Sequence, residues 1–133
     1  MSADRRTVLV VEDDAPLRRM ISIFLRAAGY RVCAAEDGLS GLALTREERP
    51  DLVLLDLMLP GLDGWEVLRR IKGDALTAAI PVLVLTASAD LPFTEQALLL
   101  GATSFLTKPI DSRVLVEHVD AVLGQTAGQE EHA

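Results

Sequence analysis

Short apolar runs alternate with amphipathic segments along the whole chain. The apolar runs are rich in valine, leucine and alanine, and they cover Thr7–Val11, Arg31–Ala35, Leu52–Leu55, Val82–Leu85 and Ser104–Leu106. Runs of this length and composition predict β-strands. The segments between them have helical spacing and predict helices over Ala15–Ala28, Leu39–Glu48, Gly64–Lys72, Leu91–Leu100 and Ser112–Leu123. The pattern therefore predicts five β-α units in succession.

The first predicted helix has the clearest apolar stripe. Its members recur at spacings of three and one along about four turns, and they are Leu17, Met20, Ile21, Phe24, Leu25 and Ala28. Asp14 is a suitable cap for its first turn, where Pro16 costs nothing, and Gly29 is suited to end it. Asp37 is the candidate cap of the second helix, and the third should turn Trp65, Leu68 and Ile71 inward.

Three of the predicted strands are apolar at every position rather than at every second one. These are the first, third and fourth strands, whose apolar cores are Val8–Val11, Leu52–Leu55 and Val82–Leu85. Such strands are covered on both faces, as in a parallel sheet between two layers of helices. The sequence thus predicts a doubly wound α/β domain over residues 7–123, with an N-terminal extension over residues 1–6 and a flexible tail over residues 124–133.

Composition and charge limit the classes of protein to consider. A length of 133 residues fits one compact domain. The net charge of −7 argues against direct contact with nucleic acid, so we expect protein partners. The sequence has no signal peptide pattern and no membrane-spanning run, which favours a cytoplasmic protein. Cys33 lies among apolar neighbours and is expected to be buried and unreactive.

Polar and charged residues gather where the predicted strands end. Glu12 and Asp13 follow the first strand, Asp56 the third, Thr86 the fourth and Lys108 the fifth. Ligands of an open parallel sheet bind outside the carboxyl ends of its strands, so these side chains should converge. Three adjacent carboxylates repel one another unless a cation lies among them. Mg²⁺ suits such a site because it accepts few carboxylates and readily adds a phosphate oxygen.

The same residues have the chemistry of phosphoryl transfer. The Asp56 carboxylate can attack phosphorus, while the Lys108 ammonium and the Thr86 hydroxyl can neutralise the transferring oxygens. Each residue alone also has an ordinary structural explanation, such as a helix cap, a strand-end hydroxyl or a solvated surface charge. Their combination in this order favours the functional interpretation, and only Asp14 is assigned a purely structural role as a cap.

The runs VLVVEDDAPLRRMI, PDLVLLDLMLPGLDGWEVLRRIK, PVLVLTAS and GATSFLTKP resemble the bacterial two-component response-regulator receiver family, in the manner of a stand-alone chemotaxis regulator. The resemblance covers about Thr7 to Leu123. It implies a flavodoxin-like fold with five parallel strands in the order 2-1-3-4-5 and five helices. It also implies the roles of single residues: Glu12, Asp13, Asp56 and the Met58 carbonyl would be the metal ligands, and Asp56 would be the phosphoacceptor. Thr86 and Lys108 would bind the phosphoryl group, and Thr86 and Phe105 would form the switch pair. The Lys108–Pro109 peptide bond would be cis.

The resemblance further implies how such a domain works. Asp56 would accept a phosphoryl group from a histidine kinase or a histidine phosphotransfer protein, with Mg²⁺ or Mn²⁺ bound. The domain would be no enzyme for a separate substrate, but would catalyse its own phosphorylation and slow dephosphorylation. Signalling would follow from a change in the surface formed by the fourth helix, fifth strand and fifth helix, through a protein target or a second copy of the domain. The alternative is a receiver cut from a longer transcription regulator or hybrid kinase.

Two other classes of protein use related parallel sheets. A flavin-binding electron carrier needs a hydroxyl- and glycine-rich loop after its first strand, and Glu12 and Asp13 would repel the flavin phosphate there. A phosphohydrolase of the haloacid-dehalogenase type needs a second aspartate two residues beyond its nucleophile, where this chain has Met58. Flavin colour would indicate the first class, and turnover of phosphomonoesters the second.

Overall fold

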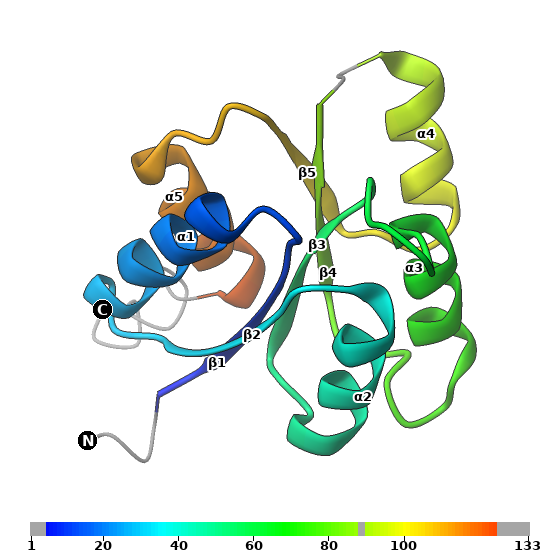
Figure 1. Ribbon diagram of the computed structural model, residues 1–133, viewed down its shortest axis with the longest axis horizontal. Helices are drawn as coiled ribbons and strands as arrows, with labels where there is room; N and C mark the ends of the chain where they lie inside the picture. Colours follow the sequence, from blue (N-terminus) through cyan, green and yellow to red (C-terminus); the bar gives the residue numbers. More distant parts are fainter. Residues whose placement is uncertain (1–4, 88–89, 125–133) are drawn as a thin grey trace.

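The computed structural model describes residues 5–87 and 90–124 (Figure 1). The described elements follow the order that the sequence predicts, and they are β1 (Thr7–Val11), α1 (Ala15–Ala27), β2 (Arg31–Ala35), α2 (Gly38–Glu48), β3 (Leu52–Asp56), α3 (Gly64–Gly73), β4 (Val82–Thr86), α4 (Leu91–Leu99), β5 (Ser104–Thr107) and α5 (Ser112–Leu123). The predicted extension and tail lie outside the described residues, except Arg5, Arg6 and Gly124. None of the helices described is long and apolar enough to span a membrane.

The five strands form one parallel sheet in the order β2-β1-β3-β4-β5. The predicted doubly wound α/β fold is therefore confirmed. Val11 pairs with Leu55 in β3, which is followed by Asp56, and Thr86 pairs with Thr107 in β5. This register brings the carboxyl ends of the three inner strands and of β5 to the same edge of the sheet. The residues that follow these strands consequently face a common space.

Helices cover both faces of the sheet, with α1 and α5 on one side and α2, α3 and α4 on the other (Figure 1). Because successive strand residues point to opposite faces, the sheet divides the interior into two separate cores. The α1/α5 core is built on Val8, Val10, Ile21, Leu25, Leu52, Leu54, Leu83, Leu85, Leu115 and Val119. The α2/α3/α4 core is built on Leu9, Val11, Leu42, Val53, Leu55, Leu57, Val67, Leu68, Ile71, Val84 and Ala97.

An aspartate stands at the N-cap position of each of the five helices, and four of these carboxylates cap the first turn of their helix. The Asp14 carboxylate accepts a hydrogen bond from the Leu17 amide at 3.0 Å, as predicted, and Asp37 accepts one from the Ser40 amide at 2.8 Å. Asp63 and Asp111 cap α3 and α5 in the same way. Such caps satisfy amides that have no partner within the helix. Gly29 follows α1 with a φ of 101°, a conformation that glycine adopts without strain.

One prediction of side-chain orientation is wrong, and one is incomplete. Ala28 is exposed rather than part of the buried stripe, because α1 ends at Ala27. Trp65 packs against the α2/α3/α4 core as predicted but is only half-buried, whereas Val67 is fully buried in α3. The indole also stacks on Phe93 of α4, with ring centroids 6.1 Å apart. The packing of α4 against α3 therefore decides the place of Trp65, and the periodicity of α3 alone does not encode it.

Candidate phosphoryl and metal site

Asp56 is the last residue of β3 and lies at the centre of the carboxyl edge of the sheet. The residue is 1% exposed, because β1 and β4 flank its strand. Its Oδ1 accepts a hydrogen bond from the Met58 amide at 3.0 Å, and its Oδ2 accepts one from Lys108 Nζ at 3.1 Å. Both oxygens are thus held by donors that leave the carboxylate pointing into the space above the sheet.

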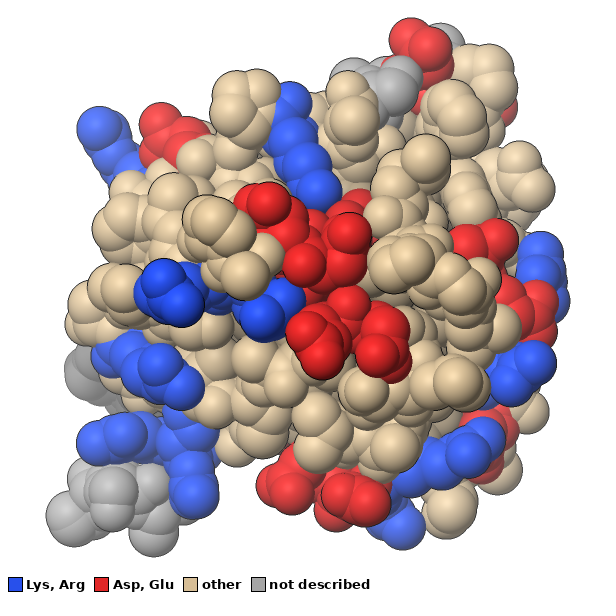
Figure 2. All heavy atoms as spheres, viewed as in Figure 1, with Lys and Arg blue, Asp and Glu red and all other residues tan. Residues whose placement is uncertain are grey.

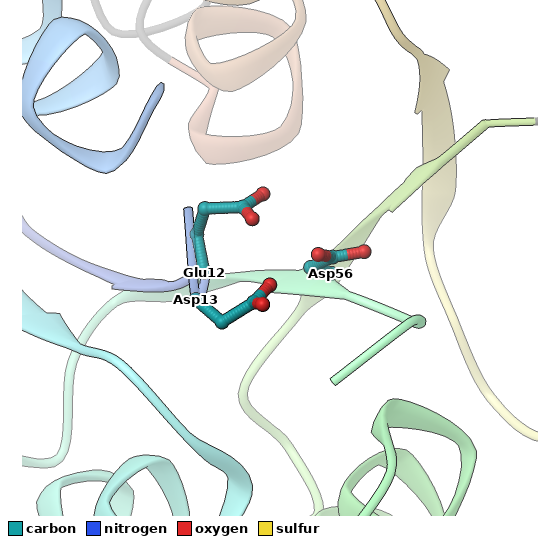
Figure 3. A group of neighbouring side chains, drawn as sticks. All are labelled: Glu12, Asp13 and Asp56. Carbon is teal, nitrogen blue, oxygen red and sulfur yellow. The ribbon is translucent and has the colours of Figure 1, made fainter. Parts of the chain in front are cut away.

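Glu12 and Asp13 bring two more carboxylates from the end of β1. Figure 3 shows both side chains extending toward Asp56. One oxygen from each of the three residues lies within 4.8 Å of the others. Glu12 is fully buried, whereas Asp13 is exposed to solvent. In Figure 2 acidic side chains gather near the middle of this face of the molecule, with basic side chains directly beside them.

Lys108 supplies a positive charge within the site. Its Nζ lies 3.1 Å from Glu12 Oε1 and 3.1 Å from Asp56 Oδ2, so one ammonium bridges two carboxylates. The Lys108 amide donates to the Thr86 carbonyl at 2.9 Å, which fixes the residue beside the end of β4. Burial opposes the charged form of the ammonium, but the ion pairs with Glu12 and Asp56 outweigh it and raise the pKa of Lys108.

Glu12 is the carboxylate that most needs a cation. Burial raises its pKa to about 7, although the Asp14 amide and Lys108 both favour the charged form. Its Oε2 accepts a hydrogen bond from the Asp14 amide at 3.1 Å. Its Oε1 is buried and accepts no hydrogen bond from any residue that the structure describes; its contact with Lys108 is an ion pair. An oxygen held in this way retains lone pairs for a metal ion.

The donor set fits a hard divalent cation. Three carboxylate oxygens close together, one of them buried without a hydrogen bond, are ligands that Mg²⁺ and Mn²⁺ prefer. The exposure of Asp13 leaves one side of the cluster open to water, and Mg²⁺ commonly keeps several waters. The site therefore suits an ion that must also accept an oxygen from a phosphoryl group.

Thr86 and Phe105 lie on neighbouring strands on the α4 side of the site. Thr86 ends β4 and is 7% exposed, while Phe105 in β5 is half-buried against the α2/α3/α4 core. Both residues line a gap beside Phe93 and Ala97 of α4 that is too narrow for a water molecule. The gap therefore leaves no room for the Phe105 ring to turn further inward while the other side chains that line it stay in place.

The segment after β3 brings the backbone close to Asp56. The Met58 side chain is 71% exposed, and its amide is the group that contacts Asp56. Gly64 begins α3, and a Cβ added there would collide with the Asp56 carbonyl and with Leu57. Only glycine allows α3 to start so near the site. The Lys108–Pro109 peptide bond at the other side of the site is cis.

Arg18 is one residue of the site region that the sequence pattern did not indicate. Its Nη1 donates to the Glu12 carbonyl at 2.8 Å and more weakly to the Asp13 carbonyl at 3.4 Å. The contact joins a side chain of α1 to backbone oxygens, so no spacing of residue types reveals it. The tryptophan and phenylalanine that stack between α3 and α4 were missed for a similar reason, because their contact depends on how the two helices pack.

Comparison with known proteins agrees with this geometry. Residues 8–120 match the family described as response regulator receiver domain. The phosphate regulon transcriptional regulatory protein PhoB of Pseudomonas aeruginosa is 44% identical over 121 residues, which are 91% of this chain and 53% of that protein. A DNA-binding dual master transcriptional regulator of Synechocystis is 43% identical over 90% of this chain and 49% of its own length. The chain spans about half the length of these relatives.

Solved structures extend the likeness. A chemotaxis protein of Vibrio cholerae has a TM-score of 0.85 and 30% identity, covering 89% of this chain and 98% of that one. The receiver domain of a sensor histidine kinase from Pseudomonas aeruginosa has a TM-score of 0.83 and 31% identity, covering 90% of this chain and 98% of that one. The latter structure has a magnesium ion coordinated in its active-site cleft.

Proposed function

The chain belongs to the family of response regulator receiver domains, and from this premise we propose that Asp56 accepts a phosphoryl group from a phosphohistidine on a partner protein. The donor would be a histidine kinase or a histidine phosphotransfer protein. One observation supports the proposal most directly, namely the buried Asp56 carboxylate that shares the Lys108 ammonium with Glu12 at the carboxyl edge of the sheet.

The transfer needs little covalent chemistry from the protein. An oxygen of Asp56 forms a bond to phosphorus, the bond from phosphorus to the donor imidazole nitrogen breaks, and the imidazole leaves with the electron pair. Lys108 and Thr86 would neutralise the transferring oxygens. The product is an acyl phosphate, which water attacks slowly at phosphorus to restore the carboxylate. In this sense the domain would catalyse its own phosphorylation and dephosphorylation, without a separate substrate.

Glu12, Asp13, Asp56 and the Met58 carbonyl are the residues that we propose to hold Mg²⁺, with Mn²⁺ as a substitute. The ion would neutralise negative charge on the cluster and on the phosphoryl oxygens. Support comes from the three carboxylates within 4.8 Å of one another and from the buried oxygen of Glu12. The Lys108 ammonium already offsets part of this charge, so the carboxylates can be held together before the ion binds.

Phosphorylation would change the surface formed by α4, β5 and α5. The phosphoryl oxygens would draw the Thr86 hydroxyl toward the site, and the vacated space would admit Phe105. The narrow gap beside these two residues supports this order of movement. A target that binds the state with Phe105 turned inward would therefore bind more tightly after phosphorylation.

The partner of this surface would be a target protein or a second copy of the domain. The domain would act in the cytoplasm without inserting into a membrane, and it would not itself contact nucleic acid. The net charge of −7 supports a protein partner. A second candidate setting has its own support, because the relatives are about twice as long and are named as transcriptional regulators. In that setting the domain would be the receiver part of a longer regulator, and a linked output module would bind DNA.

Incubation with acetyl phosphate and Mg²⁺, followed by mass spectrometry of peptides, tests the proposed acceptor. We expect one phosphoryl group per chain, located on Asp56 and lost after mild treatment with hydroxylamine, which cleaves acyl phosphates. A phosphoryl group on a serine, a threonine or a histidine would contradict the proposal.

Lys108→Ala should separate phosphorylation from signalling. The variant should still accept the phosphoryl group, within about tenfold of the wild-type rate, because Asp56 and the metal ligands remain. It should lose most of its phosphorylation-dependent association, because the ammonium no longer joins the phosphoryl group to the segment after β5. Labelling and pull-down measure the two effects, with Arg19→Ala as the control, because Arg19 is exposed on α1 and lies outside this surface. Normal association of phosphorylated Lys108→Ala would contradict this role.

Leu99→Glu should abolish phosphorylation-dependent association while Asp56 is phosphorylated normally. Leu99 is 85% exposed on α4, as the four apolar residues Ala97–Leu100 predict, while Ala97 is buried. Burial of a leucine in an interface contributes about 2 kcal/mol, so loss should exceed about tenfold in affinity. Light scattering and pull-down after beryllofluoride treatment measure it. Leu76→Glu, at a leucine that is 59% exposed outside α4, is the control. Unchanged association of Leu99→Glu would exclude this face.

A further inference from the structure

The chain must turn between β1 and α1 in such a way that the carboxylates of Glu12 and Asp13, the acidic pair, face the same cluster. Glu12 and Asp13 are consecutive, and consecutive side chains of an extended strand point to opposite faces. Both carboxylates nevertheless reach the same cluster (Figure 3). The Glu12 amide makes a bond to the sheet, to the Ala35 carbonyl at 3.0 Å, and the Asp14 carbonyl accepts the first bond of α1 at 2.8 Å. The turn that redirects the chain is therefore confined to Glu12, Asp13 and Asp14.

Arg18 supplies hydrogen bonds to the carbonyls of this turn. The Glu12 and Asp13 carbonyls lie between the last bond of the sheet and the first bond of the helix. Arg18 Nη1 donates to the Glu12 carbonyl at 2.8 Å and approaches the Asp13 carbonyl at 3.4 Å. The arginine is half-buried and reaches back over the first turn of α1. One nitrogen therefore contacts the two peptide groups that set the directions of the two carboxylates.

We propose that Arg18 is a positioning residue of the metal site, which holds the β1–α1 turn so that Glu12 and Asp13 both face the bound cation. The proposal rests on the proposed function, because it assigns Arg18 a role toward the metal ion. Arg18 touches neither the ion nor the phosphoryl group. It acts through the backbone, as hydrogen bonds that orient metal ligands do in other sites.

The charge of Arg18 makes the proposal sharply testable. A guanidinium near a cation site repels the ion, so removal of its charge alone would strengthen Mg²⁺ binding. Loss of positioning would weaken it. The two explanations therefore predict opposite signs for the same substitution. Arg19 is the matched control, because it is the next residue of the same helix, has the same charge and is exposed.

The experiment measures Mg²⁺ affinity by calorimetry and thermal unfolding in EDTA, for the wild type, Arg18→Met, Arg19→Met and Asp13→Ala. We expect Arg18→Met to raise the dissociation constant about tenfold, and Arg19→Met to leave it within about twofold. The amide NMR signals of Glu12, Asp13 and Asp14 should shift in metal-free Arg18→Met and not in Arg19→Met. Equal or tighter Mg²⁺ binding by Arg18→Met would overturn the proposal.

Arg18→Lys decides the question if Arg18→Met does not fold. Lysine keeps the charge and the aliphatic stem, but its side chain ends one bond short of the position of Nη1. We expect Mg²⁺ binding that is about threefold weaker, with normal unfolding, and wild-type affinity would overturn the proposal. Failure of the proposed metal site and failure of the proposed role of Arg18 give different results. Wild-type protein that binds no Mg²⁺, or Asp13→Ala that binds it normally, would refute the proposed metal site itself rather than the role of Arg18 alone.

Discussion

Asp56→Asn should abolish phosphorylation while the fold remains intact. The amide has nearly the shape of the carboxylate but cannot act as the nucleophile toward phosphorus, so labelling by acetyl phosphate should fall by roughly a thousandfold or more. The substitution also removes one of three neighbouring negative charges and so lowers their mutual repulsion. We therefore expect the metal-free variant to remain folded. Labelling measures the first effect, and circular dichroism during thermal unfolding measures the second.

Asp63→Asn is the matched control for this substitution. Asp63 lies in the same segment between β3 and α3, and its Oδ1 caps α3 by accepting a hydrogen bond from the Glu66 amide at 2.9 Å. Asparagine caps helices as well as aspartate does, so this variant should be labelled at the wild-type rate. Stable labelling of Asp56→Asn at any other residue would show that the acceptor is elsewhere.

Asp13→Ala should weaken Mg²⁺ binding by about a hundredfold and make labelling undetectable at Mg²⁺ concentrations that saturate the wild type. Asp13 is the exposed member of the cluster, so its removal should disturb packing little. Thermal unfolding in EDTA should therefore stay close to wild type, whereas the increase in stability caused by added Mg²⁺ should disappear. Calorimetric titration with Mg²⁺ and labelling over a range of Mg²⁺ concentrations measure these effects.

Glu36→Ala is the control for the loss of an acidic residue at this edge of the sheet. Glu36 follows β2 and is exposed, but it is not among the three carboxylates that lie within 4.8 Å of one another. Its removal should leave Mg²⁺ affinity within about twofold of wild type, since a screened surface charge contributes little. If Glu36→Ala and Asp13→Ala weakened Mg²⁺ binding equally, the effect would come from overall charge and not from a ligand.

The strands and helices were predictable because each has a strong local signal. Fully apolar runs identify the inner strands, and aspartates mark the beginnings of α1 and α2. The position of the site followed from the fold, since residues after parallel strands must meet at one edge. Small differences occur only at element ends. Asp56 and Thr86 close their strands rather than follow them, because each still pairs with a neighbouring strand.

Features that depend on three-dimensional packing were not predictable. Cys33 was expected to be buried but is half-buried, because β2 is an edge strand; burial still raises the pKa of its thiol. Glu12 is fully buried, although the local sequence does not indicate that it, rather than Asp13, should be the buried acidic residue. The contact of Arg18 with backbone carbonyls arises only when α1 lies beside the end of β1, and the stacking of Trp65 on Phe93 arises only when α3 and α4 lie side by side.

The division of the interior into two cores has a consequence for how such a domain can change over evolution. Phe105 packs against the α2/α3/α4 core, and Leu57 and Ala97, which line the gap beside Thr86, belong to it. The α1/α5 core lies behind the sheet and contains none of them. Substitutions such as those at Ile21 or Leu25 of α1 would therefore alter the free energy of unfolding with little effect on the proposed movement of Thr86 and Phe105. A change of stability in the α1/α5 core would then leave the proposed switch largely as it is, so the two properties could evolve separately.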